Sequence, residues 1–307
     1  MPQYQLEVDF NTDKNPSDAS LSVEAKALYS MPKSSQLLKW VGNKQTFAPF
    51  ITSHFDEFNT YFEPFLGSAA VLGHLAPREA VASDAYKPLI EIWEMLSKSP
   101  QTVIKWYSDR YQILEDHGHR EGYELIKANF NKSPNAADLL FISRSCYGGV
   151  IRFRKHDGYL STPCGIHKPI KPEKFAMRAK LWNERIANVD FRVMDYSEAI
   201  DLAKEGDLVY CDPPYIHSQA ILYGGQNFIF SDLINSLELA VSRGVKVALS
   251  IDGTKKSGND QCKVEIPKGL FPRELFVPLG ASMLKRFQRS GQDCLDEHVQ
   301  DRLLLSW

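Results

Sequence analysis

GDLVYCDPPY, at residues 206–215, decides how the rest of the chain folds. Its apolar centre is typical of a buried strand. The strand cannot continue through two consecutive prolines, because proline has no backbone N–H to donate to a ladder. The sequence therefore predicts that Asp212 and Tyr215 lie at the carboxyl edge of a sheet, where open α/β sheets bind their ligands.

The end of this stretch brings together a carboxylate, a rigid backbone carbonyl and an aromatic ring. These are the groups needed to hold a planar base that carries an amino group. The alternative is an ordinary turn after a strand, since Asp-Pro and Pro-Pro are common in turns. The remainder of the chain has to decide between the two.

Length and composition exclude several classes of protein. A chain of 307 residues suits one large α/β domain, or a domain with an insertion. With 43% hydrophobic and 24% charged residues, its composition is that of a soluble globular protein. The net charge is −2, so any contact with nucleic acid has to come from a local basic patch.

The cysteines and the N-terminus indicate a cytoplasmic protein. The five cysteines are scattered and form no Cys-x-x-Cys, which favours a reducing compartment and argues against a structural zinc site or a disulfide framework. The start, MPQYQLEVDF, has neither the basic nor the apolar region of a signal peptide. No segment approaches the length of a membrane span, and we predict no metal site.

Two further strands end in residues suited to a nucleotide. Residues 61–73 predict a strand, a turn of small residues at Gly67, and a helix rich in Ala and Leu. Such a turn lets an adenosyl group lie against the backbone, although it is not the Gly-x-Gly-x-x-Gly of dinucleotide sites. The strand at 79–84 ends in Asp84, 17 positions after Gly67. A carboxylate there holds a ribose diol; alternatively, Asp84 caps the helix predicted at 85–96.

Strands and helices alternate in the rest of the chain, which predicts an α/β fold with a mainly parallel sheet. A strand-like piece turns at residues 42–43 and presents Lys44 near a helix start. Another strand ends in Asp195-Tyr196. After it we expect segments in the following order: a helix at 197–204, the strand of the DPPY stretch, a helix at 233–242, a strand at 245–251 and a closing strand at 301–307.

A basic region precedes the second half of this pattern. Residues 97–142 predict helices, whereas 143–185 are rich in Arg and Lys, poor in acids and interspersed with aromatic residues. Short strand-like runs separated by Gly148-Gly149, Asp157-Gly158 and Pro163 suggest a β-hairpin in the basic region. A two-stranded ribbon fits the major groove of DNA, where guanidinium groups read guanine and lysines meet phosphates. The alternative is a solvated, charged insertion. A second, smaller basic segment lies at 282–289.

Four motifs occur in an order that is typical of one family. They are LKWVGNK at 38–44, EPFLGS at 63–68, SD at 83–84 and DPPY at 212–215. In this combination the chain resembles the Dam-type (D12 class, group alpha) DNA adenine-N6 methyltransferases, from about residue 36 to the C-terminus. The resemblance implies a Rossmann-like class I methyltransferase sheet, with an inserted, mostly helical target-recognition region that carries a β-hairpin.

The resemblance also implies a division of the chain. Residues 1–35 would be an N-terminal extension, 36–96 and 186–307 the S-adenosylmethionine-binding catalytic domain, and 97–185 the DNA target-recognition insertion. The implied reaction is transfer of a methyl group from S-adenosylmethionine to N6 of a flipped adenine in double-stranded DNA. A cognate restriction endonuclease would fit such an enzyme, but no residue points to one, and the oligomeric state is open.

Roles for individual residues follow from matching the motifs. The residues expected at the catalytic centre are Asp212, Pro213, Pro214 and Tyr215. Asp212 and the Pro213 carbonyl would accept hydrogen bonds from the adenine amino group, and the Tyr215 ring would stack on the base. The residues expected around the cofactor are Trp40, Lys44, Glu63, Phe65, Gly67, Asp84, Asp195 and Tyr196. Those expected on DNA are Lys39, Arg144, Tyr147 and Arg152, with Arg154 and Lys155 of the basic hairpin.

Departures from the family pattern fall in the segment that would read the bases. Gly148 follows Tyr147 where members that read GATC carry Asn, and residues 161–165 are Ser-Thr-Pro-Cys-Gly instead of Asn-Val-Pro-Phe-Gly. The sequence therefore predicts a target other than GATC. The alternatives are a cytosine-N4 methyltransferase, for which Ser would be expected at position 212, and a catalytically silent DNA-binding protein on the same fold.

Overall fold

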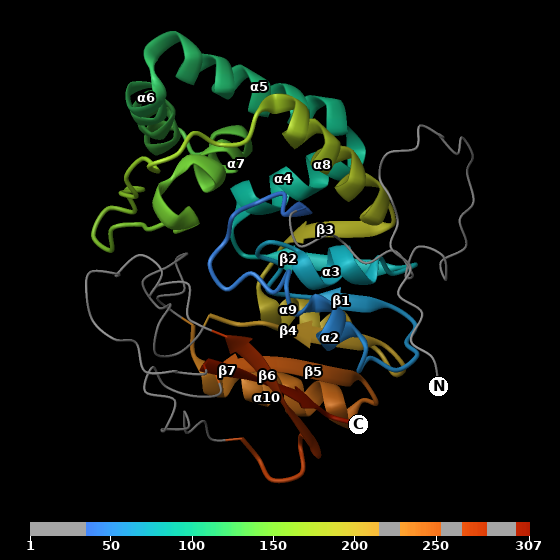
Figure 1. Cartoon of the computed structure of the whole chain (residues 1–307). Helices are drawn as coiled ribbons and strands as arrows, with labels where there is room; N and C mark the ends of the chain where they lie inside the picture. The colour runs from blue at the N-terminus through green and yellow to red at the C-terminus, as the bar shows by residue number, and fades with distance from the viewer. Residues whose placement is uncertain (1–34, 215–227, 253–265, 281–298) are drawn as a thin grey trace, which may run out of the picture.

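A mixed β-sheet organises the computed structural model, which describes residues 35–214, 228–252, 266–280 and 299–307. Within these residues seven strands form one sheet in the order β3-β2-β1-β4-β5-β7-β6 (Figure 1). The strands are β1 (Tyr61–Glu63), β2 (Ala80–Asp84), β3 (Val189–Val193), β4 (Leu208–Cys211), β5 (Lys246–Asp252), β6 (Arg273–Gly280) and β7 (Val299–Leu305). The first five are parallel, and β7 pairs antiparallel with β5 and β6. The predicted Rossmann-like α/β sheet is confirmed.

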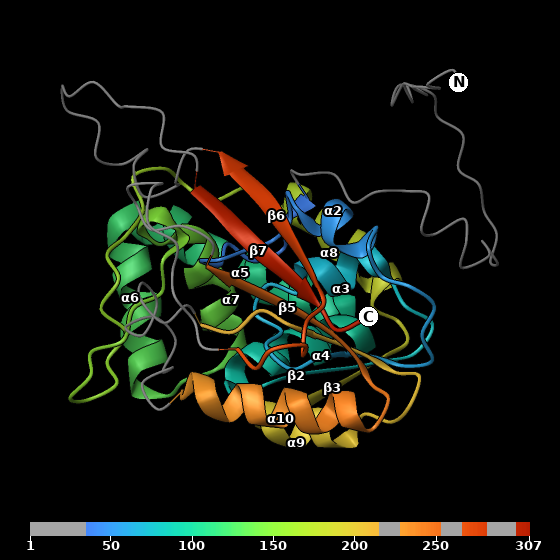
Figure 2. The same ribbon diagram turned by 90° about the horizontal axis from the view of Figure 1, so that it is seen from below.

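The central strands are buried on both faces. Side chains alternate along a strand, so Tyr61 and Tyr210 point into one hydrophobic core while Phe62 and Val209 point into another. The second core is filled by α9 (Tyr196–Leu202) and α10 (Phe230–Ser242), which lie side by side on one face of the sheet (Figure 2). On the other face lie α2 (Ala48–Thr52) and α3 (Ala70–Leu75).

The connection between β2 and β3 carries a group of helices, which stands above the sheet in Figure 1. They are α4 (Lys87–Lys98), α5 (Pro100–His117), α6 (His119–Lys132), α7 (Ala136–Ser145) and α8 (Pro172–Arg185). Helix α4 contacts β2 and β3 as well as α5, α7 and α8, and so it joins this group to the sheet. The helices expected over 97–142 are present. The division into a catalytic domain and an inserted domain stays a prediction.

The basic stretch at 143–185 is less strand-like than its sequence suggested. It begins within α7 and ends with α8, so hairpin-like pairing is confined to the residues between them. A 3-10 turn, η2 (Tyr147–Gly149), follows α7, and isolated antiparallel bridges join Cys146 to Cys164 and Phe153 to Leu160. Arg154 N–H donates to the Tyr159 carbonyl at 2.9 Å across the tip.

Two other expectations need correction. The strand-like piece before Gly42 forms no strand. Residues 36–41 form an irregular segment, here called the strap, in which Leu37, Leu38 and Trp40 are buried. Arg144 of α7 and Arg178 of α8 donate hydrogen bonds to its backbone carbonyls. Strand β6 was not expected, and it includes Pro278, which an edge strand tolerates because one side of its ladder is unpaired. No helix in the described part of the chain is both long and apolar enough to cross a membrane.

Candidate functional site

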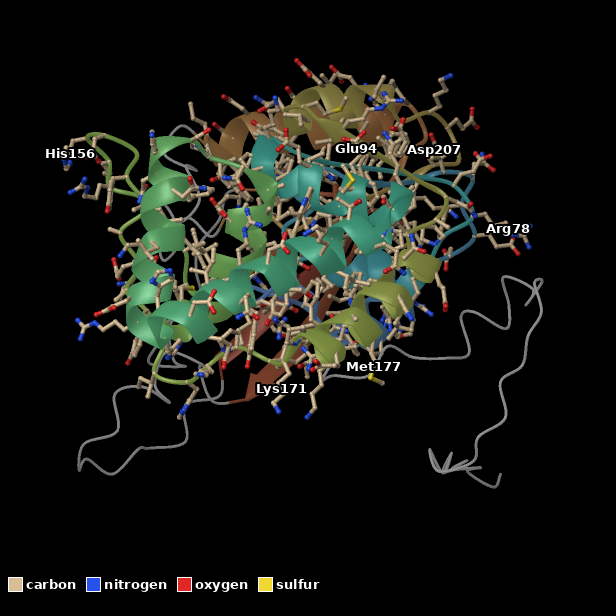
Figure 3. All side chains as sticks on the ribbon, turned by 90° about the horizontal axis from the view of Figure 1, so that it is seen from above. Arg78, Glu94, His156, Lys171, Met177 and Asp207 are labelled. Carbon is tan, nitrogen blue, oxygen red and sulfur yellow. The ribbon has the colours of Figure 1, made fainter. Side chains whose placement is uncertain are left out.

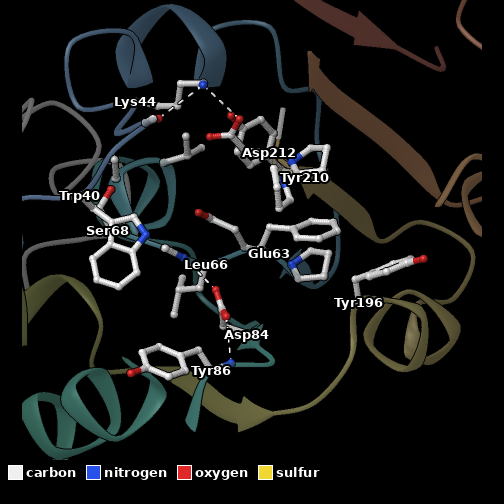
Figure 4. Close-up of a pocket in the computed structure, with 18 of the residues that line it drawn as sticks. Trp40, Lys44, Glu63, Leu66, Ser68, Asp84, Tyr86, Tyr196, Tyr210 and Asp212 are labelled. Carbon is white, nitrogen blue, oxygen red and sulfur yellow. Dashed lines mark hydrogen bonds and ion pairs between the residues drawn. The ribbon is translucent and has the colours of Figure 1, made fainter. Parts of the chain in front are cut away.

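A pocket of about 330 Å³ opens at the carboxyl edge of the parallel strands (Figure 4). It is lined by residues that follow β1, β2 and β4, because neighbouring parallel strands end at the same edge. The pocket collects the following predicted residues: Trp40, Lys44, Glu63, Phe65, Gly67, Asp84, Asp195, Tyr196, Asp212, Pro213 and Pro214. Tyr215, the last residue of the DPPY motif, lies outside the described residues.

Asp84 ties the end of β2 to the turn after β1. Its two carboxylate oxygens accept hydrogen bonds from the backbone N–H groups of Gly67 at 3.3 Å and Tyr86 at 3.0 Å. Burial raises the pKa of Asp84 to about 6, although these hydrogen bonds favour the charged form. The N-cap position of α4 is Tyr86, and no side chain caps that helix. The alternative that Asp84 is a helix cap is therefore wrong, and its carboxylate faces the pocket (Figure 4).

Gly67 occupies a position that a larger residue would disturb. Its φ of +48° is rare for residues with a side chain, and a Cβ atom there would lie 3.3 Å from the indole ring of Trp40. The Gly67 carbonyl accepts a hydrogen bond from the indole N–H of Trp93 at 3.1 Å. This turn is thus held from both sides, and it presents bare backbone to the pocket.

Aromatic rings gather at one end of the pocket. Phe65 stacks on Tyr196 with ring centroids 5.2 Å apart, and Phe228 packs edge-on against both rings. Next to them, the Asp195 carboxylate accepts hydrogen bonds from the backbone N–H and the hydroxyl of Ser197, and so caps α9. Flat apolar surfaces of this kind suit a planar ring system.

Glu63 lies on the floor of the pocket, at the end of β1 (Figure 4). The hydroxyl of Tyr61 donates a hydrogen bond to its Oε2 atom at 2.7 Å. Burial raises the pKa of Glu63 to about 8, so this acid is largely protonated at neutral pH. A positively charged ligand placed nearby would lower that pKa.

Asp212 and Lys44 form an ion pair on the opposite wall. Lys44 Nζ lies 3.0 Å from Asp212 Oδ1, and the Asp212 side chain retains 19% exposure toward the pocket. Burial raises the pKa of Asp212 to about 6, against the lowering effect of Lys44. The neighbouring acids hold the pKa of Lys44 well above its usual range, so the lysine is charged. A carboxylate can accept several hydrogen bonds, so Asp212 can also accept one from a ligand.

The residues expected on DNA divide into two groups. Lys39, Tyr147, Arg152, Arg154 and Lys155 are exposed. The Arg154 guanidinium lies 4.2 Å from the centre of the Tyr159 ring and pairs with Asp157. Arg152, Arg154 and Lys155 lie in the tip segment that includes His156, which projects from the body of the protein (Figure 3). Tyr147 lies in η2, and Lys39 lies in the irregular segment before Gly42.

Arg144 does not share this surface. It is 3% exposed, and its guanidinium donates hydrogen bonds to the backbone carbonyls of Gln36 and Leu37, each at 2.8 Å. The Gln36 carbonyl also accepts one from Arg178 at 3.0 Å. Arg144 therefore anchors the strap that leads to Lys39, and the structure leaves its guanidinium no open face for a phosphate. We therefore assign Arg144 a structural role in place of the DNA contact that was expected from the sequence.

Several residues of the site were not foreseen. Tyr210 lines the pocket below Asp212 and pairs its hydroxyl with that of Ser250 at 2.9 Å. Phe228 completes the aromatic group, and Asp301, on β7, lies 3.3 Å from Lys44 Nζ. Tyr210 was predictable, because side chains two residues apart in a strand point to the same face and Tyr210 precedes Asp212 by two residues. Sequence offered no signal for Asp301.

Comparison with known proteins agrees with this arrangement. Residues 40–259 match a family described as D12 class N6 adenine-specific DNA methyltransferase. A protein of Escherichia phage P1 named DNA N-6-adenine-methyltransferase is 29% identical over 230 residues, which are 71% of this chain and 30% of the phage protein. A Vibrio cholerae serotype O1 protein named DNA adenine methylase is 26% identical over 233 residues, 72% of this chain and 82% of the relative. A type II methyltransferase of Lactococcus lactis subsp. cremoris is 27% identical over 233 residues, 69% of this chain and 79% of the relative.

Proposed function

The chain belongs to the D12 class N6 adenine-specific DNA methyltransferase family, and from this premise we propose a specific reaction for it. It transfers a methyl group from S-adenosylmethionine to N6 of a flipped adenine within a short recognition sequence of double-stranded DNA. One observation carries the proposal. A single pocket joins Asp84 and the Gly67 turn at one end to Asp212 and Pro213 at the other.

The residues at the first end fit the chemistry of the cofactor. Asp84 presents a partly buried carboxylate that can still accept hydrogen bonds from a ribose diol, in addition to the two that it receives from backbone N–H groups. The Phe65 and Tyr196 rings offer apolar surface to an adenine, and Gly67 leaves room beside its backbone. When bound, S-adenosylmethionine supplies a methyl group on a positively charged sulfur.

The residues at the second end orient the acceptor. The N6 lone pair of adenine is delocalised into the ring, so the amino group is a poor nucleophile. Asp212 and the Pro213 carbonyl would accept its two N–H groups and turn the lone pair toward the cofactor end of the pocket. Positive charge develops on N6 as the bond from nitrogen to the methyl carbon forms and the methyl–sulfur bond breaks, and the Asp212 carboxylate would stabilise that charge. The methylated nitrogen then loses one proton to water and becomes neutral. Stacking of Tyr215 on the base stays an expectation from the sequence.

The exposed residues of the basic segment suit the approach to DNA. Lys39, Arg152, Arg154 and Lys155 supply local positive charge on a protein whose net charge is −2. Such a patch meets phosphates, and guanidinium groups in the major groove can read guanine. The adenine must leave the duplex to reach the pocket, because its N6 atom is otherwise held in a base pair. The sequence around Tyr147 and at 161–165 favours a target other than GATC. An enzyme that acts on cellular DNA is expected in the cytoplasm, and the proposal includes this location.

The proposal is tested by methyl transfer from labelled S-adenosylmethionine to duplex DNA, with the modified nucleoside identified by mass spectrometry. We expect N6-methyladenine with the native protein and none with Asp212→Ala, while that variant still binds S-adenosylmethionine. Asp190→Ala changes an exposed acid on β3 that does not line the pocket, so it is the matched control and should keep full activity. N4-methylcytosine would favour the cytosine enzyme, and absence of any modified base would favour a silent DNA-binding protein.

A further inference from the structure

A buried cluster of three charges lies in and behind the wall of the pocket. Lys44 Nζ lies 3.0 Å from Asp212 Oδ1 and 3.3 Å from Asp301 Oδ2, and it donates a hydrogen bond to the Gly42 carbonyl at 3.4 Å. The side chains of Lys44 and Asp301 are each 6% exposed. Lys44 and Asp212 line the pocket and Asp301 does not, so the lysine stands between the two acids.

We propose that Asp301 is a positioning residue for methyl transfer: it fixes the Lys44 ammonium and shares its positive charge, so that Lys44 does not fully neutralise the Asp212 carboxylate that faces the target amino group. The inference rests on the proposed function, since it assigns Asp212 the role given above. It adds a residue from β7, which belongs to none of the four sequence motifs.

The geometry around Lys44 supports this role for Asp301. An ammonium group has three N–H donors, and Lys44 has an acceptor for each in Asp212, Asp301 and the Gly42 carbonyl. Strand β5 separates β7 from β4, so Asp301 and Asp212 approach Lys44 from different strands. Two anchors hold a long, flexible side chain in one place better than one does. Asp301 therefore adds an anchor from a separate strand to those that Asp212 and the Gly42 carbonyl provide.

The net charge of the cluster supports the same role. Two carboxylates and one ammonium carry a net charge of −1, whereas Lys44 and Asp212 alone would be a neutral pair. A net negative cluster stabilises positive charge on N6 better than a neutral pair does, and the effect is strong in a buried site.

The other ionisable groups around Asp212 do not replace Asp301. Glu63 on β1 has a pKa raised to about 8 by burial, and burial raises the pKa values of Tyr210 and Cys211 on β4 above their ordinary range. All three are therefore largely neutral at pH 7. Among the described residues that affect the pKa of Asp212, Lys44 and Asp301 are the charged pair.

Asp301→Asn tests the inference because it keeps the shape of the side chain and removes its charge. We expect the single-turnover rate of methyl transfer to fall about tenfold, less than the loss for a group in direct contact with the reacting atoms. The affinities for S-adenosylmethionine and DNA should change less than twofold. The acidic limb of the pH–rate profile should move to lower pH, because Asp301 raises the pKa of Asp212. A purely structural role would not move that limb.

Glu274→Gln is the matched control. Glu274, whose side chain is 42% exposed, pairs across the sheet with Arg302, the residue that follows Asp301, at 3.3 Å. This variant should keep the native rate and pH profile. If Asp301→Asn also keeps both, or if it loses cofactor affinity in proportion to rate, the inference is overturned.

A second measurement needs no catalysis, and it separates failure of this inference from failure of the proposed function. Lys44→Met leaves the buried Asp212 and Asp301 facing each other without their cation. Adding Asp301→Asn removes one of the repelling charges, so the double variant should unfold at a higher urea concentration than Lys44→Met alone. In the native background, Asp301→Asn should lower that concentration. Equal effects in the two backgrounds would show that Lys44 and Asp301 do not act together, whether or not the native protein methylates DNA.

Discussion

Arg144 and Arg152 offer a direct test of how the recognition segment is built. Both are arginines of the same basic stretch, and both resemble family positions that meet DNA. Arg144 is buried and holds two backbone carbonyls, whereas Arg152 is exposed. Replacing each by Ala should therefore affect different properties of the protein.

The expected cost of Arg144→Ala follows from its hydrogen bonds. The Gln36 carbonyl keeps its bond from Arg178, so the Leu37 carbonyl is the one that loses its donor. A buried acceptor without a partner costs about 1–3 kcal/mol. The cavity left by the side chain adds to this, while removal of a buried guanidinium whose Nε atom has no partner offsets part of it. We expect a loss of about 2 kcal/mol in the free energy of unfolding.

The assay is urea unfolding of both variants, together with DNA affinity measured over a range of salt concentrations. Arg144→Ala should unfold at lower urea and keep the native salt dependence of binding. Arg152→Ala should keep native stability, bind DNA more weakly and lose about one unit of the salt slope, as expected for one lost phosphate contact. Native stability and a reduced salt slope for Arg144→Ala would refute the assignment.

Two further predictions concern the pocket. The methyl-transfer rate should fall as the pH drops through about 6, because Asp212, whose pKa is raised to that value by burial, loses its negative charge when it is protonated; a pH–rate profile that stays flat down to pH 5 would contradict this. Gly67→Ala should weaken S-adenosylmethionine binding about tenfold by calorimetry, since a Cβ atom at φ +48° both strains the turn and presses on Trp40. Ala69→Gly, two residues later at φ +54°, relieves a similar strain and should leave cofactor affinity unchanged.

The sequence predicted the parallel part of the fold because its signals are local. Strands β1, β2, β4 and β5 are short runs rich in apolar residues that end in a polar residue or a turn, and β3 alternates apolar and charged residues. Strand β6 was missed because it includes Pro278, which lowers the strand signal. Helix α8 was missed because its many basic residues hide a buried face that includes Phe175 and Trp182.

Site residues that directly follow a strand could be predicted from the sequence. Contacts between residues that are far apart in the sequence could not. Asp84, Asp195 and Asp212 each follow a parallel strand, so the edge of the sheet collects them. Lys44 meets Asp212 and Asp301 only because the strap and β7 fold to the same place. Arg144 shows the same limit: its sequence context is basic, but its burial depends on packing of the strap against α7 and α8.

The central claim is that this chain methylates adenine N6 at one short DNA sequence, through Asp212. The most direct test is methylation-sensitive sequencing of DNA from cells that express the chain, or the Asp212→Ala variant. We predict N6-methyladenine at a single short motif with the native chain and its absence with the variant. Unmodified DNA in both, or a methylated base that persists in the variant, would contradict the account.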